Sequence, residues 1–351
     1  MRIAVVCLAI CLLLSGCTGW MEGSYMSMNP HVVDTESQKQ SRITVSDGEQ
    51  MYAALEELVE RGGDAGTFYL QELDSEAAQT AMSGAVSRIL SNHPVGVFVV
   101  EEITWELGTI GSSPALAVTV GYNQNRVQLP NIKKTNGVTQ MQERIGEALL
   151  ACSPYLVMEV SGYSSTDFSQ LVRDYADAYP EQVIETPQVS VDMYPEKGTE
   201  RVIELRFSYQ TDTESLRQMQ EDVQPVFTAA TMYVLAEDQQ LRKFDQLHSF
   251  LMGRHDYTAG TSITPTYSLL HHGVGDSRAF AVVYAAMCLD AGLECYVVSG
   301  TREGEPHFWN LICVDGAYYH VDLRPGGAFQ TLTDSQMTGY VWDYSAYPIS
   351  Q

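Results

Sequence analysis

The chain is poor in basic residues. Lys and Arg together number 20 among 351 residues, against 44 Asp and Glu, which gives a formal net charge of −24 at pH 7. The acidic residues are spread along the chain, and no basic stripe is present to neutralise the phosphates of a nucleic acid. The composition therefore argues against a nucleic-acid partner. Acidity of this kind keeps a protein soluble and repels it from anionic surfaces.

The chain also begins without a hydrophobic run long enough for a stable transmembrane helix. The apolar run Ile3 to Leu14 follows a single basic residue and is too short to span a bilayer stably. It leads into Ser15, Gly16 and Cys17, which resemble the cleavage site of a lipoprotein, where the chain is cut before a cysteine that carries a diacylglycerol. An ordinary signal peptide cleaved nearby and an uncleaved anchor are the alternatives.

We therefore expect residues 1–16 to be a lipoprotein signal peptide and Cys17 to be the lipidated N-terminus of the mature protein. The lipid would tie the protein to the outer face of a membrane, so the predicted location is extracytoplasmic and lipid-anchored. The segment that follows, 17–45, is polar and contains Gly19, Gly23 and Asn29-Pro30. This composition predicts a flexible tether between the membrane and the folded part.

A metal-binding cysteine pattern is absent as well. Of seven cysteines, four remain after the signal peptide and the lipidated residue are set aside: Cys152, Cys288, Cys295 and Cys313. Their spacing is not that of a metal site. Pairing of Gly300 with His307 across a hairpin would place Cys295 opposite Ile312, next to Cys313. This leaves a disulfide open as an alternative, although we favour free buried thiols.

Histidine and carboxylate side chains in the C-terminal part suit zinc by ligand type, but not by spacing. They are His271, His272, Asp276 and His307. Because two adjacent loop histidines are more often solvated than metal-bound, we predict no metal and no cofactor.

The part of the chain after the tether contains an internal repeat, 46–134 and 135–212. Each copy opens with a helix, at Ser46 to Met51 and at Thr135 to Met141, and continues with a strand, a helix and two strands. The predicted elements are Thr67–Leu73, Ser75–Leu90, Val95–Trp105 and Ala115–Tyr122 in the first copy, and Pro154–Val160, Ser165–Tyr179, Val183–Met193 and Arg201–Tyr209 in the second. The fold class is therefore α+β, with tandem αβαββ repeats whose helices cover one sheet face.

The remaining segment, 213–351, begins with helical patterns and then forms a compact series of motifs. A glycine-rich approach leads into a helix from about Arg278 to Ala291, which Asp276 and Ser277 can cap and Gly292 can close. Strands at 294–299, 307–314 and 317–323 follow, joined by turns. In this order His307 opens the second strand and Asp322 ends the third, so a helix N-terminus, a histidine and an aspartate could converge.

This layout resembles the transglutaminase-like superfamily, which combines a nucleophilic Cys at a helix N-terminus, a His in an H-x-W segment and an Asp after W-Y-x-V. The matching residues are His307-Phe308-Trp309-Asn310 and Tyr318-Tyr319-His320-Val321-Asp322, and the resemblance extends from about Thr213 to Tyr347. It implies an α+β papain-like domain with site positions Ser277, His307 and Asp322. The nucleophile position departs from the family, because Ser277 stands where the Cys is expected.

That departure changes the chemistry. A Cys at a helix N-terminus beside a His is held as a thiolate, whereas a serine hydroxyl must lose its proton during attack. We therefore expect a catalytically silent domain that binds a peptide, protein or cell-wall partner. The alternatives are an active Ser277/His307/Asp322 acyl transferase or amide hydrolase, and a structural surface protein in which the domain is scaffold.

Overall fold

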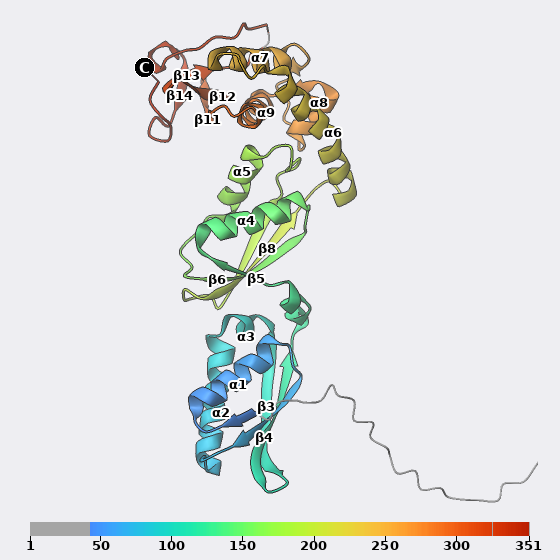
Figure 1. The fold of residues 1–351 in the computed structure, drawn as a ribbon, viewed down its shortest axis with the longest axis vertical. Coiled ribbons are helices and arrows are strands. Elements are labelled where there is room, and N and C mark those ends of the chain that lie inside the picture. Colours follow the sequence, from blue (N-terminus) through green and yellow to red (C-terminus); the bar gives the residue numbers. More distant parts are fainter. Residues whose placement is uncertain (1–42, 325, 351) are drawn as a thin grey trace, which may run out of the picture. The chain divides into compact units, whose positions relative to one another are not determined.

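The computed structural model describes residues 43–324 and 326–350, which have the mixed α+β fold that the sequence predicts (Figure 1). The predicted signal peptide, Cys17 and most of the predicted tether lie outside the described residues. Within the described part, no helix combines the length and the apolar character that crossing a membrane requires.

Residues 43–131 form a first α/β unit with one sheet. Its elements are β1 Ile43–Val45, α1 Gly48–Glu60, β2 Ala65–Leu70, α2 Ser75–Ser91, α3 Pro94–Val99, β3 Val100–Ile110, β4 Ser113–Tyr122 and η1 Gln124–Asn131. The strand order is β1-β2-β4-β3, in which β1 is parallel to β2 and the other pairs are antiparallel. Leu55 and Leu58 of α1 and Met82 of α2 share one core with Phe68 and Leu116 of the sheet, so the helices cover one sheet face.

Residues 133–208 form a second α/β unit. Its elements are β5 Lys133–Asn136, α4 Gly137–Leu150, β6 Tyr155–Ser161, α5 Phe168–Ala178, β7 Gln188–Tyr194 and β8 Arg201–Ser208. The strand order is β5-β6-β8-β7, again with a parallel first pair. The two units therefore have the same sheet topology, while their descent from one repeated sequence stays a prediction.

Two details of these units differ from the predicted elements. The expected strand Val95–Trp105 begins instead with the short helix α3, because Pro94 occupies the first helical turn and His93 accepts a hydrogen bond from Gly96 N at 3.0 Å through Nδ1. Each unit also opens with a short strand that the sequence pattern did not indicate. The first of these, β1, pairs with β2 and takes the last residues of the predicted tether, 43–45.

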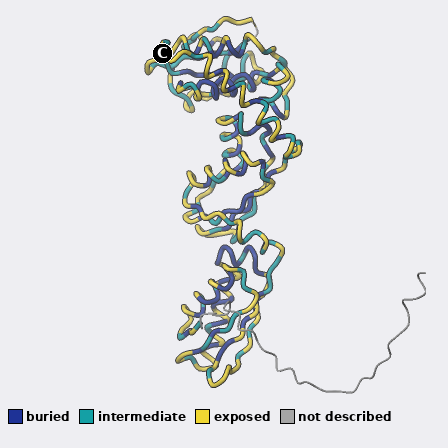
Figure 2. Tube along the Cα trace, turned by 45° about the vertical axis from the view of Figure 1, so that its right-hand side comes forward, coloured by how far each residue is buried: buried dark blue, intermediate teal, exposed yellow. Residues whose placement is uncertain are grey.

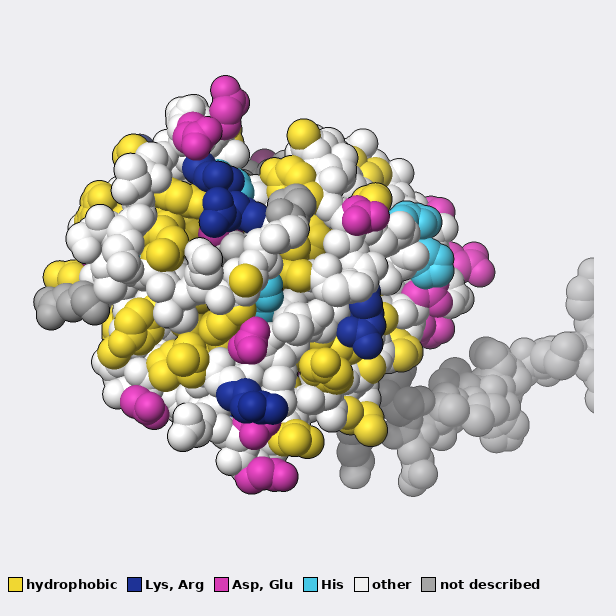
Figure 3. All heavy atoms as spheres, turned by 90° about the horizontal axis from the view of Figure 1, so that it is seen from above, with side chains coloured by type: hydrophobic (Ala, Val, Ile, Leu, Met, Phe, Trp, Pro, Cys, Tyr) yellow, Lys and Arg dark blue, Asp and Glu magenta, His cyan; other side chains and the backbone are white. Residues whose placement is uncertain are grey.

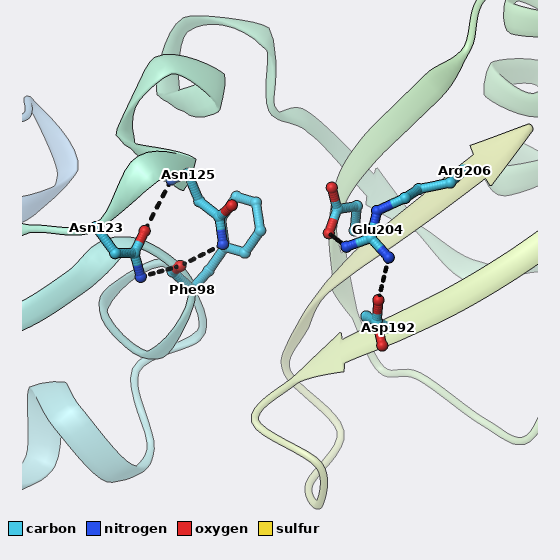
Figure 4. Close-up of polar contacts among 6 residues, drawn as sticks. All are labelled: Phe98, Asn123, Asn125, Asp192, Glu204 and Arg206. Atoms are coloured by element: carbon cyan, nitrogen blue, oxygen red, sulfur yellow. Dashed lines mark hydrogen bonds and ion pairs between the residues drawn. The ribbon is translucent and has the colours of Figure 1, made fainter.

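Polar contacts hold the segment that follows the first sheet (Figure 4). Asn123 and Asn125 each donate from Nδ2 to the carbonyl oxygen of Phe98 at 3.1 Å. In the second unit, Arg206 reaches Asp192 at 2.6 Å and Glu204 at 2.5 Å across its sheet. The carbonyl oxygen of Phe98, near the end of α3, thus has two hydrogen-bond donors. Arg206, in turn, is an example of a guanidinium group in this protein that is held by two carboxylates.

The C-terminal domain packs helices against an antiparallel sheet. Its elements are α6 Thr213–Tyr233, α7 Gln240–Met252, β9 Asp256–Tyr257, α8 Pro265–His272, β10 Val274–Gly275, α9 Ser277–Asp290, β11 Cys295–Arg302, β12 Glu305–Val314, β13 Ala317–Val321, η2 Asp334–Gln336 and β14 Tyr340–Trp342. The strand order is β13-β12-β11-β14. The predicted register is confirmed, because Gly300 pairs with His307 and Cys295 with Ile312. The four cysteines in the described part are free thiols; Cys152 and Cys288 are buried as we expected, whereas Cys295 and Cys313 are only half-buried, so the expected burial is wrong for these two.

Helix α9 is the central element of this domain and is buried on every side. Its residues from Ala279 to Cys288 are all buried, whereas longer helices such as α1, α2 and α6 have exposed residues along their length (Figure 2). Leu269, Phe244 and Ile312 contribute to the same core from α8, α7 and β12. A helix that is apolar all round is typical of such a position. Gly292 closes it in the left-handed conformation, at φ 71°, as the sequence indicated.

Candidate functional site

The structure places Ser277 at the first residue of α9. Asp276 is the N-cap and accepts a hydrogen bond from Ala279 N at 2.9 Å, so the prediction that Ser277 shares the capping role is wrong. The Ser277 side chain is directed instead to the sheet, where its Oγ accepts a hydrogen bond from Phe308 N at 3.3 Å. Gly275 allows this close entry, because a Cβ there would lie 3.1 Å from the Cβ of Ala279. The hydroxyl is therefore buried at a helix N-terminus.

His307 and Asp322 form a bonded pair. His307 Nε2 lies 2.9 Å from Asp322 Oδ1, and their side chains are 9% and 2% exposed. The pair follows from strand register, since His307 lies on β12 and Asp322 directly follows β13, the neighbouring strand. Two of the three predicted site residues are thus joined by a hydrogen bond.

Ser277 is close to this pair in the fold but not bonded to it. Because Asp322 occupies Nε2 of His307, only Nδ1 remains to act on a nucleophile. Among the described residues no hydrogen bond links Ser277 Oγ to the His307 ring, and the hydroxyl is bonded to the Phe308 amide instead. Within the described residues, the structure therefore has a histidine–aspartate pair next to a serine whose oxygen accepts from a backbone amide and makes no hydrogen bond to the imidazole.

Three further side chains surround Asp322, and the motif analysis did not assign them a role. Tyr340 Oη donates to Asp322 Oδ2 at 2.5 Å, while Arg324 Nε and Arg302 Nη1 lie 3.3 and 4.0 Å from the same oxygen. Burial, and then the hydrogen bond to Asp322, raise the pKa of Tyr340, so the phenol keeps its proton and stays a donor.

A second histidine–aspartate pair, His320 and Asp334, is bonded to Trp309, which packs against the His307 ring. Trp309 is fully buried, and its ring stacks near that of His307 at 6.2 Å between centroids. Trp309 Nε1 donates to Nδ1 of His320 at 3.0 Å, and His320 Nε2 lies 2.9 Å from Asp334 Oδ1. Burial lowers the pKa of His320, and the nitrogen that accepts from Trp309 leaves the ring proton for Asp334. Trp309 therefore packs against the His307 ring as part of the buried support of the site.

Asn310 on β12 connects the sheet to α9, the helix that begins at Ser277. Its Nδ2 donates to the carbonyl oxygen of Ala281 at 2.8 Å and lies 3.4 Å from that of Tyr296. The Asn310 amide nitrogen thus donates to backbone carbonyls of α9 and β11. The other residues that we weighed as metal ligands, His271 and His272, stack with Tyr267 on α8, and the described residues contain no cluster of three groups suited to a metal.

Comparison with known proteins gives a class to this part of the chain. Residues 228–323 match the model of the transglutaminase-like superfamily. The match spans α7, α9, the strands β11 to β13 and the His307–Asp322 pair, so the C-terminal part of the chain is a transglutaminase-like domain. No curated protein matches the chain.

Solved structures show only distant likeness. One described as a TGase is 11% identical, with 64% of this chain and 65% of that chain covered and a TM-score of 0.28. A candidate cysteine protease from Cytophaga hutchinsonii is 12% identical, with coverage of 41% and 66% and a TM-score of 0.26. A candidate protease from Parabacteroides distasonis is 8% identical, with coverage of 79% and 44% and a TM-score of 0.26. The chain thus spans less than two thirds of each of these structures' length, and such low scores carry no further argument.

The packing around Gly300 gives a stability prediction. A Cβ at Gly300 would lie 2.3 Å from the carbonyl oxygen of Val341 and 2.8 Å from Cη2 of Trp309. Gly300→Ala should therefore destabilise the protein by about 1–3 kcal/mol, as overpacking of a buried site does. The measurement is urea unfolding of the full chain followed by tryptophan fluorescence.

The matched control for this variant is Gly108→Ala on β3, where an added Cβ meets nothing within 4 Å. It should stay within about 1 kcal/mol of the wild type. Equal stability of the two variants would show that β11, β14 and Trp309 are not packed as described.

Proposed function

We propose that the protein is an extracytoplasmic lipoprotein whose transglutaminase-like domain binds a peptide, protein or cell-wall ligand without catalysing acyl transfer. The observation that carries this proposal is the state of Ser277. Its hydroxyl is bonded to the Phe308 amide at 3.3 Å and not to His307. A serine becomes a nucleophile only when a base takes its proton during attack, and within the described residues no hydrogen bond joins Ser277 Oγ to the imidazole of His307, the neighbouring base.

The charge at the N-terminus of α9 is a second argument against catalysis. A transglutaminase-like nucleophile benefits from the positive end of the helix dipole and from free amide donors that can hold an oxyanion. Here Asp276 places a carboxylate beside the nucleophile position and occupies the amide of Ala279. An oxyanion forming at Ser277 would meet this negative charge.

A ligand-binding role is supported by the open cleft beside His307. The cleft has a volume of about 740 Å³ and is lined by Tyr257, Arg302 and Arg324 together with His307. This is enough space for several residues of a peptide, and polar groups that converge in a cleft are typical of binding sites. Loss of the nucleophile leaves this recognition surface in place.

The alternative is an active acyl transferase or amide hydrolase, and the bonded His307–Asp322 pair favours it. In that mechanism His307 takes the Ser277 proton as Oγ attacks the acyl carbon, then gives the proton to the leaving amine. Water or an acceptor amine next attacks the acyl-enzyme and loses its proton to His307, which passes a proton to the departing Ser277 Oγ as the acyl–oxygen bond breaks. Asp322 orients the ring throughout.

Replacement of the serine by cysteine tests whether the site lacks only its nucleophile. The thiol of Ser277→Cys should sit at a helix N-terminus beside His307, which favours the thiolate. It should react with iodoacetamide near pH 7 at least about tenfold faster than glutathione, and His307→Ala in the same background should slow it. The rate is measured by mass spectrometry of the peptide that carries residue 277.

Ser75→Cys is the matched control, because Ser75 opens α2 directly after the N-cap Asp74, as Ser277 follows Asp276. The two described His–Asp pairs, His307–Asp322 and His320–Asp334, both lie in the C-terminal domain. If the Ser277→Cys thiol reacts no faster than the thiol at position 75, His307 does not activate a nucleophile at position 277. The remaining hypothesis would then be that the domain is a structural scaffold.

The proposed location depends on Cys17, which lies outside the described residues. Metabolic labelling with a palmitate analogue should tag the wild-type protein and leave Cys17→Ala unlabelled, since the thiol is the predicted site of lipid attachment. Equal labelling of both proteins would remove the lipid anchor from the proposal.

A further inference from the structure

Two arginines line the cleft beside His307, in a chain with few basic residues. Arg302 ends β11 and Arg324 follows Asp322, so strand order brings together two positive charges that are far apart in sequence. Basic side chains on the face drawn in Figure 3 stand in a few small patches among apolar and acidic ones. Two neighbouring arginines that line one cleft are therefore unusual on this acidic molecule.

Neither guanidinium makes a hydrogen bond within the described residues. Arg324 Nε lies 3.3 Å from Asp322 Oδ2 without hydrogen-bond geometry and is a buried donor that lacks a partner. Arg302 Nη1 lies 4.0 Å from the same oxygen. By contrast, Arg206 contacts two carboxylates at 2.6 and 2.5 Å. The donors of Arg302 and Arg324 thus remain available to a group in the cleft.

Asp322 makes no hydrogen bond to either arginine within the described residues, and each of its oxygens accepts from another group. One oxygen is bonded to His307 and the other accepts from Tyr340. Two guanidinium groups against one carboxylate leave one positive charge at this point of the cleft. Both arginine side chains are about one third exposed, at 31% and 38%, so a ligand can reach them.

Glu303 and Glu305 also line the cleft, are exposed and form no ion pair with the arginines in the described part of the chain. Two arginines against these glutamates and Asp322 leave the cleft as a whole without a positive excess, so the ligand group must be one that the two guanidinium groups hold locally. A single carboxylate fits this condition better than a phosphate dianion, which would add a second charge facing Asp322 and the glutamates. The planar fork of a guanidinium also matches the two oxygens of a carboxylate.

We propose that Arg302 and Arg324 bind a carboxylate of the ligand, so that the domain recognises peptides with a free C-terminal or side-chain carboxylate next to His307. This inference rests on the proposed binding function and narrows it to an anionic class of peptide. Binding weakens at high ionic strength, because the arginines are partly exposed to solvent.

The test uses the full-length protein and four probes: N-acetyl-tetraalanine as the free acid, the same peptide as its C-terminal amide, an amidated peptide with one central Glu, and inorganic phosphate. Binding is followed by NMR of the arginine side-chain Nε–Hε signals. Both carboxylate peptides should bind about tenfold or more tightly than the neutral amide, and should shift the Arg302 and Arg324 signals. A preference between the two carboxylate peptides identifies the source of the carboxylate.

Arg302→Gln and Arg324→Gln should each reduce the affinity for the free acid toward that of the amide. Arg302→Lys keeps the charge and should retain part of the affinity, which separates recognition from a folding defect. Arg61→Gln, on the exposed end of α1, is the matched control and should change nothing.

Three results would overturn the inference. Equal binding of acid and amide, unaffected by the arginine variants, would sink the carboxylate site while leaving peptide binding intact. Binding of phosphate alone would show that the arginines serve a different anion. Absence of binding by every probe would count against both the carboxylate site and the proposed peptide-binding function.

Discussion

The burial of α9 between the helical layer and β12 is the constraint on which the rest of the C-terminal domain depends. Asn310 on β12 bonds to the carbonyl oxygen of Ala281, and Phe308 donates its amide to Ser277. These two contacts fix the start of the helix against the strand that carries His307. Because interiors are densely packed, a shift of the helix would disturb the sheet as well.

The sheet supplies the remaining geometry through register. Pairing of Gly300 with His307 on one side and of Asn310 with Val321 on the other brings His307 beside Asp322. The Trp309–His320–Asp334 chain then holds the strand pair from below with fully bonded polar groups. A site built in this way keeps its shape whether or not a nucleophile is present. Under the proposal that the domain is silent, this support accounts for its well-formed histidine–aspartate pair.

The sequence predicted the elements whose signals are local. Alternating apolar residues and turns indicated β11 to β13 with their register, and caps at Asp276 and Gly292 indicated α9. Short strands such as β1 carry too few residues for a pattern, and α3 depends on a cap by His93 within an apolar run that is typical of a strand. The surroundings of Asp322 were also missed, because Arg302 and Tyr340 approach it only through sheet pairing between β11 and β14.

The central claim is that Ser277 lacks the activation a nucleophile requires, and reaction with a fluorophosphonate tests it most directly. Such a probe bonds covalently to a serine hydroxyl only when a base activates it. Intact mass spectrometry of the full-length protein should show no adduct under conditions that fully label an active serine hydrolase. One adduct at residue 277, lost in Ser277→Ala and slowed in His307→Ala, would contradict the account and establish the active enzyme.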